Sequence, residues 1–158
     1  MPLTFRPVPI DTEPAASLAG AMRAEIRAVY DDLDIDSPTM PAAGPAELGA
    51  PGGTFLVGYE PDGTPVCCGG VKRIEDGTCE IKRMFVAPQA RGRGYARELL
   101  GALEDAARAL GYQTARLDTG PRQPDAERIF RESGYAPIGN FNANPVASFF
   151  GEKPLSRP

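Results

Sequence analysis

The stretch at residues 86–96 reads VAPQARGRGYA and separates two segments with different apolar periods. Apolar residues alternate with polar ones before it, and from Ala96 to Leu110 they recur at helical spacing. The apolar period therefore lengthens from that of a strand to that of a helix across a glycine-containing turn. We expect a strand to end at this turn and a helix to begin there, closed by Gly111.

Two glycines give this turn the chemistry of an anion-binding site. Gly92 and Gly94 admit positive φ and close approach of a ligand, and the first helical turn offers unpaired N–H groups at the positive end of its dipole. Such a place binds phosphate. A P-loop is excluded because its Lys-Ser/Thr pair is missing, and a Rossmann fingerprint is excluded because Arg97 takes the third glycine position.

The residues before the turn predict a three-stranded antiparallel meander. Turn sequences PDGT (61–64) and EDGT (75–78) separate apolar segments at 54–60, 65–74 and 79–88.

The amino-terminal third predicts one strand, one helix and a loop. Residues 4–8 read as a short strand, and apolar residues from Leu18 to Leu33 recur at helical spacing after Pro14. Residues 37–53 are rich in Pro, Ala and Gly and are expected to be a loop with at most one short helix.

The residues after the turn complete an α/β domain of the α+β type. A strand is expected at 114–120, a helix at 125–133 and a last strand at 147–153. We predict one domain over residues 1–158, with a mixed, mostly antiparallel sheet of six to seven strands, about four helices and one parallel crossover.

Composition excludes several functions. With 158 residues and 42% hydrophobic content, one core is expected, and the net charge of −4 argues against nucleic-acid binding. The absence of histidine removes Ser-His-Asp and Cys-His systems and the usual zinc sites, so no metal is expected. The three cysteines are expected to be buried free thiols. No signal peptide or membrane span is expected, which places the chain in the cytoplasm.

The chain resembles the GNAT superfamily of acetyl-CoA-dependent N-acetyltransferases. Gln89, Gly92 and Gly94 match the Q/R-x-x-G-x-G/A motif with which that superfamily holds the pyrophosphate of acetyl-CoA. The resemblance covers residues 65–154 and is tightest over 79–135, where Phe130 and Tyr135 follow at family-like spacing. It implies a GNAT-like sheet in which two parallel strands splay apart to admit the cofactor.

The resemblance also implies the cofactor contacts. The N–H groups of residues 91–96 would cradle the pyrophosphate, and Arg91, Arg93 or Arg122 would reach the 3′-phosphate unless these arginines are surface residues. The pantetheine arm would pair with backbone near Val86. The cofactor-binding residues expected are Met84, Phe85, Val86, Gln89, Arg91, Gly92, Arg93, Gly94, Tyr95, Ala96, Gln123 and Phe130.

Catalysis needs a base for the protonated amine and a donor for the oxyanion. The N–H of Met84 is the expected oxyanion donor. Glu80 is the expected base, because strand alternation would put Glu80, Lys82, Met84 and Val86 on one face; the alternative for Glu80 is a surface ion pair. Phe130 stands where many relatives have a tyrosine acid, so Tyr135, Tyr95 or water would protonate the thiolate.

The acceptor predicted from sequence is a small primary amine or an amino-acid-like molecule, attacking directly in a ternary complex. The acidic run at 31–36 either attracts a cationic amine or is a solvated turn, and the loop at 141–145 either forms one wall of the acceptor pocket or is an ordinary surface loop. Three alternatives stay open: a non-catalytic acyl-CoA sensor, a protein or peptide N-acetyltransferase, and a nucleotide-binding α/β protein. A homodimer is left open, and no nucleic acid or membrane partner is expected.

Overall fold

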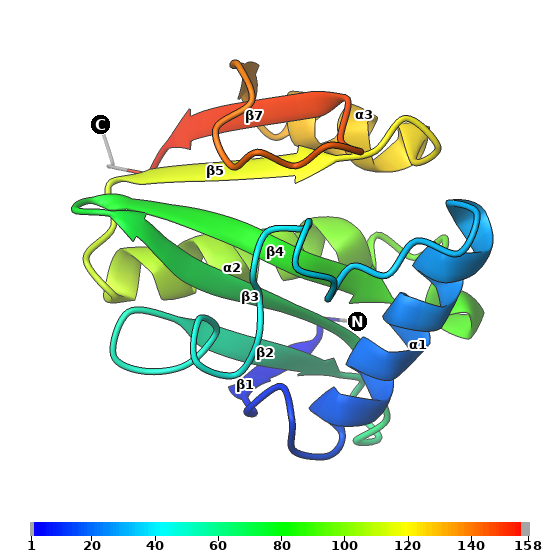
Figure 1. Ribbon diagram of the computed structural model, residues 1–158. Helices are drawn as coiled ribbons and strands as arrows, with labels where there is room; N and C mark the ends of the chain where they lie inside the picture. The colour runs from blue at the N-terminus through cyan, green and yellow to red at the C-terminus, as the bar shows by residue number, and fades with distance from the viewer. Residues whose placement is uncertain (1, 156–158) are drawn as a thin grey trace.

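A computed structural model describes residues 2–155 and arranges them as a mixed sheet with helices on both faces (Figure 1). In chain order the elements are β1 (Thr4–Pro7), α1 (Ala15–Val29), β2 (Thr54–Tyr59), β3 (Pro65–Glu75), β4 (Thr78–Val86), a 3-10 turn (Pro88–Ala90), α2 (Tyr95–Ala109), β5 (Thr114–Thr119), α3 (Pro124–Glu132), β6 (Ala136–Pro137) and β7 (Phe149–Pro154).

The sheet has seven strands in the order β1-β2-β3-β4-β5-β7-β6. Strands β4 and β5 are parallel, and every other neighbouring pair is antiparallel. This confirms the predicted fold class and its single parallel crossover. The helix count differs: residues 2–155 hold three α-helices where about four were expected, because the segment at 37–53 forms turns only.

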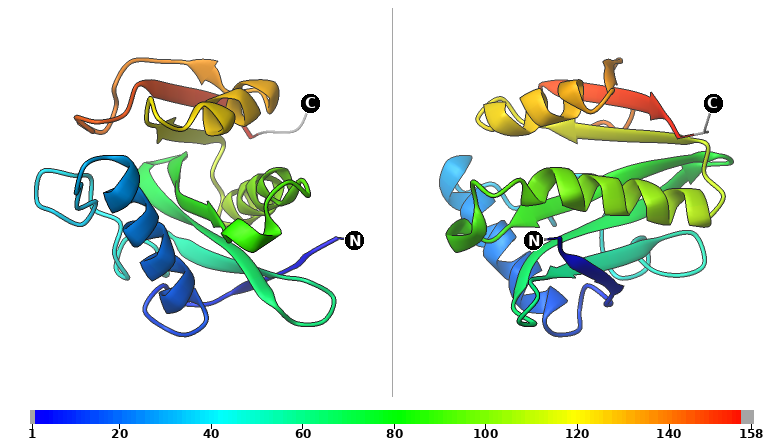
Figure 2. Two further views of the ribbon diagram at one scale, coloured as in Figure 1. Left: turned by 90° about the vertical axis from the view of Figure 1, so that its right-hand side faces the viewer. Right: turned by 180° about the vertical axis from the view of Figure 1, so that it is seen from behind.

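The helices cover the two faces of the sheet unequally. Helix α1 lies on one face and α2 and α3 on the other (Figure 2). Helix α2 buries Leu99, Leu100 and Leu103 against the sheet, as its apolar stripe predicts. The cysteine prediction is also confirmed: Cys67, Cys68 and Cys79 are free and buried, and burial raises their pKa values to about 12.

A bulge interrupts β4 immediately before the glycine turn. Cys68 pairs with Phe85, but Gly70 pairs with Lys82, so β4 holds one residue more than β3 between these two pairs. Arg83, inside the interval, has a φ of 61°. An extra residue of this kind bends and twists a strand and shifts the alternation of its side chains.

The bulge overturns one sequence expectation. Met84 and Val86 pack with the cluster under α2, whereas Phe85 packs with the cluster under α1. Cys79 and Ile81 also face α2, so Glu80 points to the opposite face from Met84. Strict alternation along β4 predicts that the side chains of Glu80 and Met84 share one face. This prediction is wrong because the bulge at Arg83 shifts the alternation of side chains by one residue.

The two parallel strands pair only at their beginnings. Three residue pairs join β4 to β5, from Thr78–Thr114 to Glu80–Arg116, although both strands continue beyond them. Figure 1 shows the two strands diverging toward their C-terminal ends. The backbone of β4 beyond Glu80 therefore has no strand partner on its β5 side.

We expect Leu103→Ala to reduce the free energy of unfolding by about 2–5 kcal/mol, because the fully buried side chain would leave a cavity under the sheet. Urea unfolding measures this loss. The matched control is Leu110→Ala at the C-cap of α2, where the residue is 39% exposed and the expected change is below about 0.5 kcal/mol. Equal losses in the two variants would contradict the packing of α2.

Candidate active site

A cavity of about 690 Å³ occupies the region where β4 and β5 diverge. Its walls come from α1 and the segment after it, from β4, from the glycine turn and the start of α2, and from the end of β5 with the start of α3. The cavity therefore reaches from the predicted phosphate site to the diverging strands. Ten of the residues expected to contact the cofactor line it: Met84, Phe85, Val86, Arg91, Gly92, Gly94, Tyr95, Ala96, Gln123 and Phe130.

The glycine turn has the backbone conformation that its sequence predicts. Gly92 and Gly94 have φ values of 82° and 81°, in the region that favours glycine. No heavy atom lies within 4 Å of where a Cβ would stand on either residue, so the backbone there is open to a ligand. The turn fits a phosphate group on this geometry.

Helix α2 starts without a capping side chain. Gly94 is its N-cap, and among the residues that the structure describes no side-chain oxygen accepts from the first-turn N–H groups. The first backbone bond of the helix runs from the N–H of Glu98 to the carbonyl of Gly94, which leaves the preceding amides to an external acceptor. Open glycine backbone and unpaired amides together make an anion cradle.

The three arginines expected near the 3′-phosphate have protein partners in this structure. Arg91 binds both carboxylate oxygens of Glu25 at 2.9 and 2.8 Å. Arg93 binds Glu60 at 2.8 Å and does not line the cavity. Arg122 donates to the carbonyl of Val29 at 2.7 Å. Gln89 also lies outside the cavity lining.

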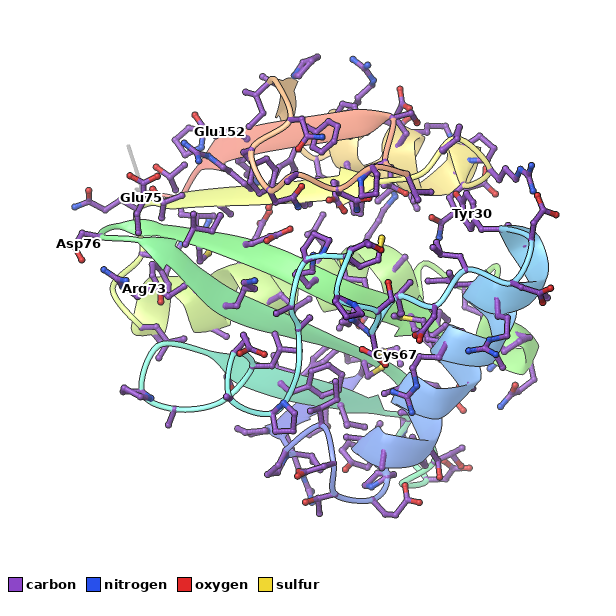
Figure 3. All side chains as sticks on the ribbon, viewed as in Figure 1. Tyr30, Cys67, Arg73, Glu75, Asp76 and Glu152 are labelled. Atoms are coloured by element: carbon purple, nitrogen blue, oxygen red, sulfur yellow. The ribbon has the colours of Figure 1, made fainter. Side chains whose placement is uncertain are left out.

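A contact between α1 and the β5–α3 connection closes one side of the cavity. Tyr30, at the end of α1 in Figure 3, donates to Oε1 of Gln123 at 3.2 Å and accepts from the N–H of Arg122 at 3.1 Å. Burial of the hydroxyl raises the pKa of Tyr30. The amide of Gln123 therefore faces the cavity with its oxygen already bonded.

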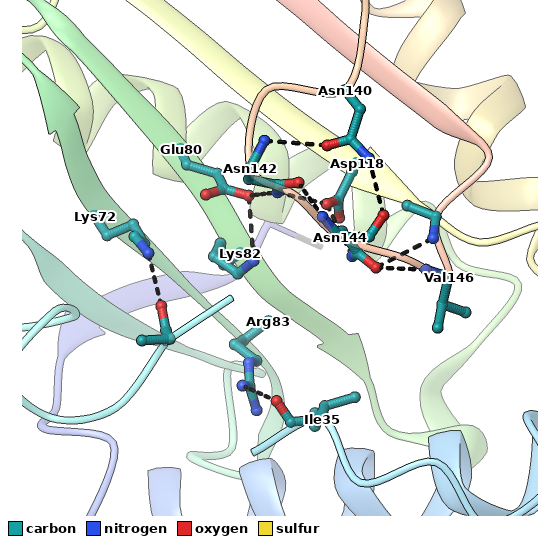
Figure 4. Close-up of polar contacts among 12 residues, drawn as sticks. Ile35, Lys72, Glu80, Lys82, Arg83, Asp118, Asn140, Asn142, Asn144 and Val146 are labelled. Carbon is teal, nitrogen blue, oxygen red and sulfur yellow. Dashed lines mark hydrogen bonds and ion pairs between the residues drawn. The ribbon is translucent and has the colours of Figure 1, made fainter. Parts of the chain in front are cut away.

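Glu80 is the centre of a polar cluster between the diverging strands (Figure 4). Its side chain is 2% exposed, and Oε2 accepts from Lys82 Nζ at 3.2 Å and from Asn142 Nδ2 at 2.8 Å. Lys82 lines the cavity, whereas Glu80 stands behind the wall. The sequence alternative of an ion pair is thus present, but it is buried and not on the surface.

Asp118 is a carboxylate of this cluster that sequence reasoning missed. Its Oδ2 accepts from Asn142 Nδ2 at 2.7 Å and from Asn144 Nδ2 at 3.0 Å. Asp118 and Asn144 line the cavity, so the loop at 141–145 contributes to the wall as expected. Asp118 occupies an outward position of the TARLDTG strand, and nothing in the sequence shows that this position faces a cavity.

Burial sets the protonation of Glu80. Desolvation raises the pKa of this carboxyl above its ordinary value, the ammonium of Lys82 lowers it, and the charge of Asp118 raises it. The hydrogen bond from Asn142 favours the ionised form. Desolvation is the largest of these effects, so the pKa of Glu80 lies above its ordinary value.

Tyr135, expected as a general acid, lies away from the cavity. Its hydroxyl donates to Glu104 Oε2 at 2.8 Å, and Glu104 also accepts from Lys153 Nζ at 3.0 Å. Burial raises the pKa of Tyr135 strongly. Tyr95 lines the cavity, but its hydroxyl donates to Glu60 at 2.7 Å.

The acidic run after α1 does not line the cavity, contrary to its expected role beside the acceptor. Only Leu33 and Ile35 of this segment do so. Asp31 pairs with Arg122 at 3.2 Å, and Asp36 pairs with Arg83 at 3.1 Å. Arginines thus compensate part of the negative charge that was expected to attract a cation.

The model of the Acetyltransferase (GNAT) family matches residues 21–135, which include β4, the glycine turn, α2, β5 and α3. The chain belongs to the GNAT acetyltransferase family. It is an N-acetyltransferase, and acetyl-CoA is the acyl donor that this family uses. The alternatives of a non-catalytic sensor and of a nucleotide-binding α/β protein are set aside.

Individual relatives agree with the GNAT assignment. An IAA acetyltransferase of Azospirillum brasilense is 42% identical over 112 residues, which cover 68% of this chain and 72% of the relative. The structure of an acyl-CoA N-acyltransferase from Klebsiella pneumoniae matches with a TM-score of 0.76 at 29% identity, over 98% of both chains. The fold is also that of N-acetylglutamate synthase from Neisseria gonorrhoeae, complexed with coenzyme A and N-acetyl-glutamate (TM-score 0.69, 17% identity), where it covers 98% of this chain and 35% of the synthase.

The described residues of this GNAT acetyltransferase contain neither a candidate membrane-spanning helix nor a candidate metal site. Across residues 2–155, no helix has the length and apolarity needed to cross a membrane. The same residues contain no group of three or more metal-ligating side chains placed to hold an ion.

We expect Asn142→Ala to raise the pKa of Glu80 further, because the ionised carboxylate loses a hydrogen bond that favours it. Carboxyl-detected NMR titration of glutamate-labelled protein measures the shift, with Glu80→Gln providing the assignment. The control is Asn140→Ala, which removes an amide of the same loop that does not contact Glu80. A shift of the same size in both variants would show that loop disorder, and not the hydrogen bond, changes the pKa.

Proposed function

We propose that this GNAT enzyme transfers an acetyl group from acetyl-CoA to the primary amine of a small, amino-acid-like acceptor by direct attack in a ternary complex. The observation that carries the proposal is the single cavity that joins the open glycine turn to the Glu80 cluster. One end of it suits a diphosphate and the other end suits an amine, with the exposed backbone of β4 between them.

The phosphate end would hold acetyl-CoA mainly through backbone. Gly92, Gly94 and the unpaired amides at the start of α2 would supply N–H groups that no side chain of residues 2–155 uses. The edge of β4 beyond Glu80 has no strand partner on its β5 side and would supply main-chain groups for the amides of the pantetheine arm. The carbonyl of Val86 accepts from Arg91 Nε at 2.9 Å, so a ligand that pairs with this carbonyl would displace or share that bond. When bound, the thioester supplies the electrophilic acyl carbon, and the N–H of Met84 is the proposed donor to its oxygen.

The amine end would remove a proton from the acceptor. Oε2 of Glu80 is bonded to Lys82 and Asn142, while Oε1 has no partner within residues 2–155. In those residues every fully buried side-chain oxygen or nitrogen has a partner, so Oε1 keeps some contact with solvent. We assign Glu80 as the general base, acting through a water molecule. The thiolate would leave with a proton from water, since the Tyr135 hydroxyl is committed to Glu104.

We expect Gly94→Asp to weaken coenzyme A binding at least about tenfold, because a carboxylate would stand beside the cofactor phosphates at the start of α2. Isothermal titration calorimetry with coenzyme A measures the dissociation constant. Gly111→Asp is the matched control: it places the same side chain at a comparable φ of 95° at the other end of α2. Unchanged affinity in Gly94→Asp would remove the proposed phosphate site.

We expect Glu80→Gln to lower kcat by about 10²–10⁴-fold, because the amide cannot accept the proton of the acceptor ammonium. The loss of kcat should be largest at pH values between the raised pKa of Glu80 and the pKa of the acceptor ammonium. In this range the wild-type base is ionised but the acceptor is still protonated. Thiol-release assays across this pH range measure it.

Two further variants identify the base. Glu104→Gln changes a buried glutamate outside the cavity and should lower kcat far less than Glu80→Gln does. Asp118→Asn tests the neighbouring carboxylate, which lines the cavity itself. A larger loss in Asp118→Asn than in Glu80→Gln would assign the base to Asp118.

A further inference from the structure

Arg83 is a buried arginine that the proposed chemistry does not use. It is the residue at positive φ in the β4 bulge, it lines the cavity, and its side chain is 6% exposed. Its Nη2 donates to the carbonyl of Ile35 at 3.3 Å and to Asp36 Oδ1 at 3.1 Å. A cation in this position is unusual in a protein core unless its donors are used.

Part of the guanidinium remains open to the cavity. Within residues 2–155, Nε and Nη1 of Arg83 have no hydrogen-bond partner, and no fully buried nitrogen lacks one. Both atoms therefore retain accessible surface, which the cavity provides. A guanidinium offers these donors as a planar fork that matches a carboxylate.

The charge around Arg83 is only partly compensated. Its carboxylate partner, Asp36, is 49% exposed and is shared with Arg23 at 3.7 Å, so solvent screens the pair. Lys82 precedes Arg83 in β4 and also lines the cavity. Its side chain is 9% exposed, and its ammonium donates one hydrogen bond, to Glu80. This wall can therefore accept one more negative group.

The remaining walls fit the rest of an amino acid. Asp118 carries a negative charge toward the cavity from β5, and apolar side chains line the face opposite β4: Met22, Ile26, Leu33, Ile35 and Met40. Given the acetyl transfer proposed above, we infer that the acceptor is an amino acid with a free carboxylate and an apolar side chain, and that Arg83 binds the carboxylate.

This arrangement selects against other amines. The amine lies toward Glu80 and Asp118, the carboxylate binds Arg83 with Lys82 beside it, and the side chain packs against Met22 and Ile26. A polyamine would bring a second ammonium to Arg83, where like charges repel. A lysine within a protein has no free α-carboxylate to offer.

The first test is acceptor choice by the wild-type enzyme. Thiol release from acetyl-CoA is measured with leucine, leucinamide and isoamylamine, which share one side chain and differ in the carboxylate. Glutamate and putrescine test side-chain polarity and cationic acceptors. We expect kcat/KM for leucine to exceed that for both analogues that lack the carboxylate by at least about tenfold, with rates compared per unprotonated amine.

The second test is substitution of the arginine. Arg83→Gln should reduce the ratio of kcat/KM for leucine to that for isoamylamine at least about tenfold through KM, and Arg83→Lys should restore part of it because the charge stays but the fork is lost. The matched control is Arg23→Gln, which also removes a partner of Asp36 but lies outside the cavity. Its ratio should stay at the wild-type value.

The outcomes separate this inference from the proposed function. Equal acetylation of leucine and isoamylamine would overturn the inference and leave acetyl transfer intact. A rise in the KM of acetyl-CoA, and not of leucine, in Arg83→Gln would assign the guanidinium to the donor and also overturn it. Coenzyme A binding without acetylation of any amine would instead refute the proposed function. If Arg83→Gln does not fold, thermal stabilisation of the wild type by leucine but not by isoamylamine decides the question.

Discussion

Pairing between β4 and β5 ends after three residue pairs, and the cavity between the two strands follows from this early end. Parallel strands normally satisfy each other's main-chain groups along their whole length. Here pairing stops after Glu80, and the bulge at Arg83 bends β4 away within the next few residues. The unpaired edge needs other hydrogen-bond partners, since main-chain groups without them are costly. A cavity that admits an amide-rich ligand satisfies this need.

The two ends of the cavity are built by different means. At the glycine turn the proposed binding groups are main-chain N–H groups, held by the positive φ of Gly92 and Gly94 and by the start of α2. At the other end they are side chains from β4, β5 and the loop before β7, joined through Asn142. Backbone recognition suits a donor common to a whole family, whereas side chains can differ between members with different acceptors.

This difference explains what the sequence could predict. Gly92 and Gly94 signal their conformation by residue type, and the change of apolar period places them between a strand and a helix. The bulge carries no such signal. Lys82, Arg83 and Met84 are ordinary strand residues, and the residue that adopts positive φ is an arginine, a type that does not favour this conformation. The contacts of Glu80 with Asn142, and of Asn142 with Asp118, join segments far apart in the sequence, which periodicity does not detect.

The bulge also explains why two neighbouring cations, Lys82 and Arg83, line one cavity. In a regular strand Lys82 and Arg83 would point to opposite faces, and Arg83 would lie under α2 among apolar side chains. The extra residue instead lets Arg83 reach Ile35 and Asp36 in the segment after α1, while Met84 takes the place under α2. Burying a guanidinium in the α2 core would be strongly unfavourable, and moving it into a polar, partly solvated wall removes most of that penalty. The same local distortion therefore opens the strand pair and brings a cation to the cavity that it opens.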